Sequence, residues 1–187
     1  MDGFTSTNHY WTKSLIKGAW ISILSKDTAI LALKYYQTAC EDLQAAADLI
    51  ERQHYAIAVF HMQQSIEKIA KTIAALKGEF ISGHEVSGWL ALEISGEIDN
   101  AKEIVIFLKE IEDLVNKTRY PFRQRGKIVS PMELISQDYA TNALSRSQHV
   151  SEHLLNYLKV KFNFQLDSPN QDNGEEPESD ARNSNEG

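Results

Sequence analysis

One stripe of apolar side chains between residues 55 and 76 constrains the fold of this chain more than any other feature. Its members are four and then three residues apart throughout, namely Tyr55, Val59, Met62, Ile66, Ile69, Ile73 and Leu76. Because an α-helix has about 3.6 residues per turn, this spacing places all seven side chains along one helix face. Gly78 then provides a typical helix stop. The pattern predicts a helix from about His54 to Lys77 with one buried face.

Similar but shorter stripes predict further helices on both sides of this one. Their approximate bounds are Thr28–Gln53, a short helix His84–Ile94, Ile98–Lys117, and a long final helix that ends near Phe162. Ser130, Pro131 and Glu133 have the order of a capping box with proline in the first turn, which predicts a helix start there. No segment shows the alternation that is typical of β-strands. We therefore predict an all-α fold, an antiparallel four-helix up-and-down bundle with an extra short helix.

The composition divides the 187 residues into three parts. Residues 1–27 form an N-terminal extension in which helical spacing predicts one short helix, and residues 28–165 form the bundle. Residues 166–187 contain seven acidic residues against Arg182 alone, so we expect an acidic disordered tail. This tail accounts for most of the net charge of −7. The acidity of the chain therefore does not argue against an anionic ligand bound elsewhere.

The single cysteine and the hydropathy of the chain indicate the compartment. Cys40 has no second cysteine with which to form an intramolecular disulfide, which is typical of a reducing environment. Its neighbours Ala39 and Leu43 predict a buried small residue and not a nucleophile. No apolar run approaches the length of a membrane-spanning helix, and the N-terminus lacks the basic flank of a signal peptide. We expect a soluble, cytoplasmic protein that does not enter a membrane.

A short basic run stands out in this acidic chain. It contains five cations, two aromatic rings and no acid, as Lys117, Arg119, Tyr120, Phe122, Arg123, Arg125 and Lys127. Guanidinium groups bind phosphate oxygens in bidentate geometry, and aromatic rings stack on bases. We predict a phosphate-binding loop formed by Arg119, Arg123, Arg125 and Lys127, with Tyr120 or Phe122 against a base. The alternative is a solvated loop in which Arg119 pairs with a helix carboxylate.

A polar edge of the predicted helix 54–77 offers a candidate cleft. His61, Gln64 and Lys68 follow one another at i, i+3 and i+7, so they share one side of the helix. They could line a cleft and contact a base or phosphate, or they could face solvent or a second subunit. His84 is a further candidate, although it begins the next predicted helix, where a polar residue also has a structural role.

Several of these segments together resemble the HEPN domain, the "higher eukaryotes and prokaryotes nucleotide-binding" family. The resemblance covers roughly residues 35–160. The matching residues are Asp42 and Leu43 between alanines in the first helix, the run from His54 to Gly78, His84, and Thr118-Arg119-Tyr120-Pro121.

The resemblance implies a bundle that commonly assembles as a homodimer, with a cleft at the helix contacts. It implies a nucleotide or RNA as ligand, and a nucleotidyltransferase-family protein as partner in a toxin–antitoxin-like pair. We accordingly expect a nucleotide- or RNA-binding module that is not catalytic and needs no cofactor. A structural dimerisation or scaffold protein is an alternative of a different class.

One branch of the family consists of metal-independent endoribonucleases, in which four to six residues separate an arginine from a histidine. None of the three arginines of the basic run has a histidine at that spacing, but Arg146 and His153, with six residues between them, do fit. Both lie inside the last predicted helix at i and i+7, on one face. An endoribonuclease toxin that uses Arg146 and His153, or a diverged site at His84 or His61, is therefore an alternative function.

The string His149-Val-Ser-Glu152-His153 matches the H-x-x-E-H motif of some zinc peptidases. A helix would place both histidines on one face. A third protein ligand would have to follow in a folded segment, and the fold is expected to end soon afterwards. We therefore predict neither a metallopeptidase nor a metal site.

Overall fold

The computed structural model describes residues 26–165 of the chain. The elements are α1 (Lys26–Glu51), α2 (Tyr55–Leu76), α3 (Ser87–Ile94), α4 (Ala101–Glu112), β1 (Phe122–Gln124), β2 (Lys127–Val129), α5 (Pro131–Leu134) and α6 (Gln137–Phe162). The short helix predicted within residues 1–27 would fall almost entirely outside the described residues, and the predicted tail over 166–187 lies wholly outside them. Both therefore stay predictions.

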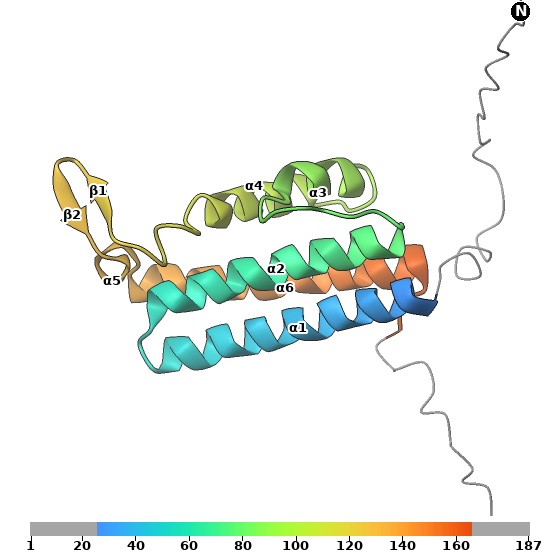
Figure 1. The fold of residues 1–187 in the computed structure, drawn as a ribbon, viewed down its shortest axis with the longest axis horizontal. Coiled ribbons are helices and arrows are strands. Elements are labelled where there is room, and N and C mark those ends of the chain that lie inside the picture. Colours follow the sequence, from blue (N-terminus) through green and yellow to red (C-terminus); the bar gives the residue numbers. More distant parts are fainter. Residues whose placement is uncertain (1–25, 166–187) are drawn as a thin grey trace, which may run out of the picture.

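The helices form an antiparallel bundle in two layers (Figure 1). α1 and α2 form a helical hairpin and α6 lies along both, while the short α3 and α4 cover the other side of α2 and α6. α5 is a single turn that leads into α6. The predicted all-α bundle is confirmed, and besides α1, α2, α4 and α6 it contains two short helices, α3 and α5. No helix among residues 26–165 is long and apolar enough to cross a bilayer.

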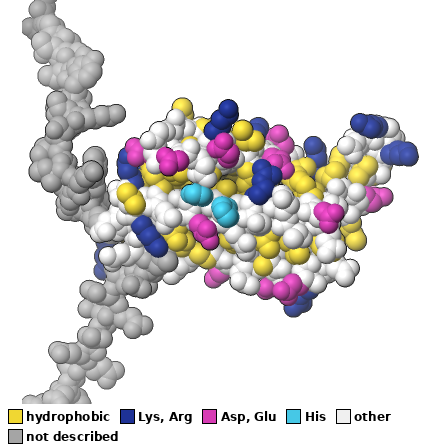
Figure 2. Space-filling view, turned by 180° about the vertical axis from the view of Figure 1, so that it is seen from behind, with side chains coloured by type: hydrophobic (Ala, Val, Ile, Leu, Met, Phe, Trp, Pro, Cys, Tyr) yellow, Lys and Arg dark blue, Asp and Glu magenta, His cyan; other side chains and the backbone are white. Residues whose placement is uncertain are grey.

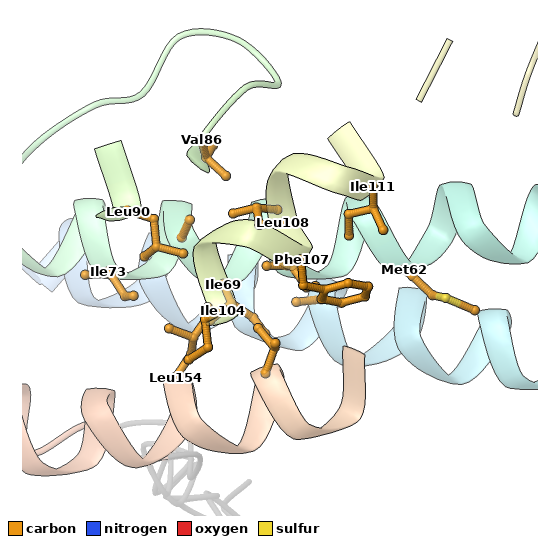
Figure 3. Close-up of a cluster of buried hydrophobic side chains, with 14 of the residues drawn as sticks. Met62, Ile69, Ile73, Val86, Leu90, Ile104, Phe107, Leu108, Ile111 and Leu154 are labelled. Atoms are coloured by element: carbon orange, nitrogen blue, oxygen red, sulfur yellow. The ribbon is translucent and has the colours of Figure 1, made fainter. Parts of the chain in front are cut away.

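The core fills the space between these two layers (Figure 3). α2, α3, α4 and α6 contribute large apolar side chains that are almost fully buried, among them Met62, Ile69, Ile73, Leu90, Ile104, Phe107, Leu108, Ile111 and Leu154. Six of the seven members of the predicted α2 stripe are buried, and Tyr55 is half-buried because it is the first residue of the helix. Burying one such side chain contributes about 1.5–3 kcal/mol, so this stripe is a main source of stability.

α2 is buried on more than its apolar face. Gln63 and Glu67 lie outside the stripe, yet their exposed fractions are only 0% and 3%. The reason is that α2 contacts α1, α6 and α4, so little of its circumference faces solvent. In contrast, Cys40 on α1 is exposed, and the prediction of a buried cysteine is wrong. Ala39 takes the buried position, and Cys40 lies about 100° further around the helix.

α5 and α6 both begin at capping serines, and the sequence predicted the first of these, Ser130. The Ser130 backbone N–H donates to Glu133 Oε2 at 2.8 Å and completes the capping box of α5. Hydrogen bonds from the backbone and side chain of Ser130 hold the pKa of Glu133 below its ordinary value. Ser136 then caps α6, because its Oγ accepts from the Tyr139 N–H at 3.2 Å.

The basic run contains a β-hairpin, which corrects the prediction that the chain has no β-strand. β1 and β2 pair antiparallel, with Gln124 opposite Lys127. Arg125 and Gly126 form the turn, and both have positive φ, 47° and 80°, as a type I′ turn requires. Strands of three residues are too short for alternation to be visible in a sequence. The hairpin projects from one end of the bundle (Figure 1).

Candidate functional site

A pocket of about 290 Å³ opens between α2, the loop before α3 and the turns that follow α4. It brings together Gln64, His84 and Arg119, which come from three separate segments of the sequence. The complete lining is Phe60, Gln64, His84, Glu85, Glu112, Val115, Asn116 and Arg119.

Arg119 lies at this pocket, and most of its hydrogen-bond donors have no protein partner among residues 26–165. Its Nε donates to the Val115 carbonyl at 3.3 Å, and its Nη2 donates to Asn116 Oδ1 at 3.2 Å. Its guanidinium carbon lies 5.2 Å from the ring centroids of both Phe60 and Tyr120, within cation–π range. A guanidinium has five N–H donors, so about three have no protein partner. Arg119 also forms no ion pair with a carboxylate of residues 26–165, contrary to the solvated-loop alternative.

His84 is held in one orientation by a buried carboxylate. Its Nδ1 lies 3.1 and 3.2 Å from the two carboxylate oxygens of Glu67. The His84 side chain is 72% exposed, whereas that of Glu67 is 3% exposed. A carboxylate that engages one imidazole nitrogen fixes the ring and leaves the other nitrogen for a ligand or a proton. His84 therefore presents Nε2 as a polar group that is already oriented.

Glu67 is the centre of a buried polar network. Its Oε1 accepts from Lys71 Nζ at 2.8 Å, and the two residues form an i,i+4 ion pair on α2. Its Oε2 accepts from Gln63 Nε2 at 3.1 Å and from Gln64 Nε2 at 3.0 Å. A buried carboxylate needs this number of partners to offset its desolvation. The network therefore fixes the amide of Gln64 as well as the ring of His84.

A second acid extends this network to α1. Asp42 Oδ1 lies 2.9 Å from His61 Nδ1, and Asp42 Oδ2 accepts from Lys68 Nζ at 2.6 Å. Lys68 Nζ also lies 3.3 Å from Gln64 Oε1. The four residues predicted for a cleft thus belong to one network, but only Gln64 and His84 line the pocket. His61 and Lys68 instead connect α2 with α1.

Glu112 fixes the wall of the pocket that carries His84. It is buried, and its Oε1 accepts from the backbone N–H groups of Val86 and Ser87 at 2.7 and 2.9 Å. Its Oε2 accepts from Ser87 Oγ at 2.5 Å. These donors lie at the N-terminus of α3, where backbone N–H groups have no helical partner. Glu112 therefore caps α3 and anchors the loop before it.

The predicted phosphate-binding residues are divided between two places. Arg119 lies at the pocket, and Tyr120 packs beside it with a largely exposed ring. Arg123, Arg125 and Lys127 belong to the hairpin and do not line the pocket. Figure 2 shows basic side chains at the end of this projection. Arg119 and the hairpin are close together in the chain, but the pocket and the hairpin are distinct surfaces.

Arg146 and His153 both line a second cavity, of about 390 Å³, between α4 and α6. Arg146 Nη1 donates to Glu110 Oε2 at 2.9 Å, and the guanidinium carbon lies 4.1 Å from the ring centroid of Phe107. Burial, with a hydrogen bond to the same Glu110, raises the pKa of Tyr139. The guanidinium of Arg146 thus has a carboxylate partner as well as a ring, whereas Arg119 has two rings but no carboxylate among residues 26–165.

The two histidines of the H-x-x-E-H string lie side by side on α6. The ring centroids of His149 and His153 are 6.1 Å apart, and both residues line the second cavity. Figure 2 shows histidine side chains lying together on one face, with acidic and basic side chains beside them. Within residues 26–165, however, no group of three or more His, Cys, Asp or Glu side chains could hold a metal ion.

Five lining residues of the first pocket are absent from the candidates that the sequence suggested, namely Phe60, Glu85, Glu112, Val115 and Asn116. Phe60 precedes Gln64 by one helical turn, so the spacing used for His61, Gln64 and Lys68 could also have included it. Glu112, Asn116 and Arg119 follow one another at i, i+4 and i+7, a spacing that would place them on one side of a helix continued to Arg119, although α4 ends at Glu112. This spacing could be found in the sequence only by counting back from Arg119, once Arg119 was taken as a site residue.

Comparison with known proteins shows the family to which the chain belongs. Residues 32–158 match the model of the HEPN domain. "Putative toxin MJ1304" of Methanocaldococcus jannaschii is 29% identical over 134 residues, which cover 68% of this chain and 88% of that protein. The crystal structure of TT1696 from Thermus thermophilus has a TM-score of 0.59 at 22% identity, covering 68% of this chain and 98% of that one. The family match covers most of the chain, and the chain therefore belongs to the HEPN domain family.

Proposed function

We propose that this chain is a HEPN-domain module that binds a nucleotide or RNA at the pocket of Arg119, without catalysing a reaction. One observation carries the proposal. Arg119 has about three free N–H donors and no carboxylate partner among the described residues, and it lies against Phe60 and Tyr120 at the pocket. An arginine with free donors beside aromatic rings suits a ligand that has both a phosphate and a base.

The other residues of the pocket have complementary roles in this proposal. His84 and Gln64 offer polar groups that the Glu67 network holds in place, so they cost little entropy to order when a ligand binds. Phe60 in the pocket, and Tyr120 beside Arg119 outside the lining, supply ring faces on which a base can stack. A volume of about 290 Å³ is at the small end of ligand pockets, so it fits one nucleotide unit.

The proposal extends to the protein's partners. The relative of M. jannaschii is named a toxin, which supports a role for this chain in a toxin–antitoxin-like pair. In that pair a nucleotidyltransferase-family protein is the partner, and the HEPN chain forms a homodimer. Co-purification of the two proteins, followed by measurement of the mass of the complex, tests this arrangement.

Replacing Arg119 by alanine is expected to weaken nucleotide binding about 10- to 100-fold. The reason is that a hydrogen bond to a charged group contributes about 1.5–3 kcal/mol, and 1.4 kcal/mol changes an affinity tenfold. Calorimetric titration with a panel of nucleoside mono- and triphosphates measures the effect, and Lys102→Ala on the far side of α4 serves as the control. Equal affinities for Arg119→Ala and the parent would end the proposal.

Thermal unfolding with ligand separates binding from the scaffold alternative. A ligand at a hundred times its dissociation constant stabilises the folded state by about 2.7 kcal/mol. A scaffold protein would show no shift of its melting temperature with any nucleotide or RNA.

The second candidate function is a metal-independent endoribonuclease, and it rests on the cavity that Arg146 and His153 share. In that case, cleavage of a labelled RNA in the presence of chelator is expected, and His153→Gln is expected to abolish it because a positioned imidazole transfers the proton. His149→Gln, one turn away, is the matched control. RNA that stays intact with the parent protein would contradict the nuclease.

A further inference from the structure

The five cations of the basic run are exposed and have no acidic partner among residues 26–165. Six lysines and arginines elsewhere form ion pairs with carboxylates, namely Lys68, Lys71, Lys77, Lys109, Arg146 and Lys161. In the basic run, Arg119, Arg123, Arg125, Lys127 and Lys117 form none with any residue from 26 to 165. Five unpaired positive charges within eleven residues repel one another, and an external polyanion would relieve that repulsion.

These charges are spread over a surface that one nucleotide cannot cover. Arg119 lies at the pocket, whereas Arg123, Arg125 and Lys127 lie on the hairpin that projects from the bundle (Figure 1). The pairing of β1 with β2 defines the hairpin, and Arg123 Nη1 donates to the Gly126 carbonyl at 3.3 Å within it. The single phosphate group of a mononucleotide in the pocket would contact Arg119 and leave the hairpin cations unused.

We propose that the ligand is a nucleic-acid strand of several nucleotides and not a free mononucleotide. One nucleotide occupies the Arg119 pocket, and the neighbouring phosphates of the same strand lie along Arg123, Arg125 and Lys127. This inference rests on the proposed function, because it takes the Arg119 pocket as the place where one nucleotide binds. It adds that the hairpin supplies a second, electrostatic part of the site.

The apolar groups around the basic run favour a nucleic acid over an acidic protein. Tyr120 and Ile128 are large apolar side chains that stay mostly exposed, and the Phe122 ring lies 6.0 Å from Lys117 Nζ. Rings that alternate with cations along the chain are typical of surfaces that bind single strands, where successive bases stack between phosphate contacts. An acidic peptide would use the cations but would gain little from the rings.

A charge-neutralised hairpin tests the inference. The variant is Arg123→Gln, Arg125→Asn and Lys127→Gln, in which asparagine before Gly126 preserves the type I′ turn. The matched control removes the same charge from exposed cations elsewhere, as Arg52→Gln, Lys102→Gln and Lys159→Gln. The probe is a labelled mixed-sequence strand of about eight 2′-O-methyl ribonucleotides, which cannot be cleaved by its own 2′-hydroxyl groups.

The hairpin variant is expected to bind this strand about a hundredfold more weakly than the parent at 0.1 M salt. Each lost phosphate contact on a single strand removes about 0.7 from the slope of log affinity against log salt, so three contacts make that slope shallower by about 2. Mononucleotide affinity is expected to stay unchanged in the hairpin variant, and Arg119→Ala is expected to weaken both ligands.

Three results would overturn the inference. The first is a hairpin variant whose strand affinity and salt slope match those of the control variant. The second is a polyglutamate of the same charge that binds as tightly as the strand, which would indicate an acidic protein as the occupant. The third is Arg119→Ala binding strand and mononucleotide as the parent does. This last result would remove the proposed function itself, whereas the first two would leave mononucleotide binding at the pocket intact.

Discussion

Replacing Glu67 by alanine is expected to lower the free energy of unfolding by about 3–5 kcal/mol. The carboxylate of Glu67 is 3% exposed and has partners on Lys71, Gln63, Gln64 and His84. Its removal leaves the Lys71 ammonium, whose side chain is only 16% exposed, without its carboxylate, and the amides of Gln63 and Gln64 each lose one of their two acceptors. The loss is therefore much larger than the net contribution that the intact ion pair makes to stability. Urea unfolding followed by circular dichroism measures it.

An exposed ion pair on the same protein provides the control. Glu97 and Lys161 are paired at 2.6 Å, with 44% and 43% of their side chains exposed. Surface pairs of this kind contribute about 0–1 kcal/mol, so Glu97→Ala is expected to cost less than 1 kcal/mol. Similar losses for Glu67→Ala and Glu97→Ala would show that the Glu67 network is not a buried structural element.

Glu67 also connects stability with the pocket. Since the Glu67 carboxylate orients His84 and Gln64, its loss removes the restraint on two pocket residues together with the stability that it provides. A variant at Glu67 that still folds is therefore a poor probe of His84. A substitution of His84 itself, whose side chain is mostly exposed, separates the two effects because it leaves the lysine and both glutamines with their acceptor.

The fold could be predicted from the sequence wherever its signal is local. The α2 stripe extends over six turns, and the helix caps at Ser130 and Ser136 involve residues three apart, so a single sequence shows them directly. The hairpin could not be predicted in this way. Its strands have three residues each, and its turn uses Arg125 where asparagine is the usual signal. The exposure of Cys40 was mispredicted because neighbouring positions of a helix can differ fully in burial.

The candidate site was predictable as residue types but not as an arrangement. Charge and aromatic content indicated Arg119 and Tyr120, and helical spacing indicated Gln64. That His84 and Arg119 line one pocket depends on how the loop before α3 packs on α2 and α4, and Glu112 anchors this loop across 25 residues of sequence. Such contacts between distant segments leave no periodic signal. For the same reason, the sequence did not show that Arg119 would lie at a pocket while Arg123, Arg125 and Lys127 would lie on a projecting hairpin.

Replacing Phe107 by alanine is expected to lower the free energy of unfolding by about 3–5 kcal/mol. Phe107 is 2% exposed and points from α4 into the core between α2 and α6 (Figure 3). Alanine leaves a cavity there and also removes the ring that lies 4.1 Å from the guanidinium of Arg146.

Ile106→Ala, one residue earlier on the exposed side of α4, is the matched control and is expected to change stability by about 0.5 kcal/mol or less. The pair of variants also tests how Arg146 is held. If the Phe107 ring and Glu110 fix Arg146 as a structural residue, Arg146→Ala in the Phe107→Ala background should cost less than Arg146→Ala alone, because one of its two partners is already gone. Fully additive losses would mean that the Phe107 ring does not hold the guanidinium, which would leave Arg146 freer to act in the second cavity.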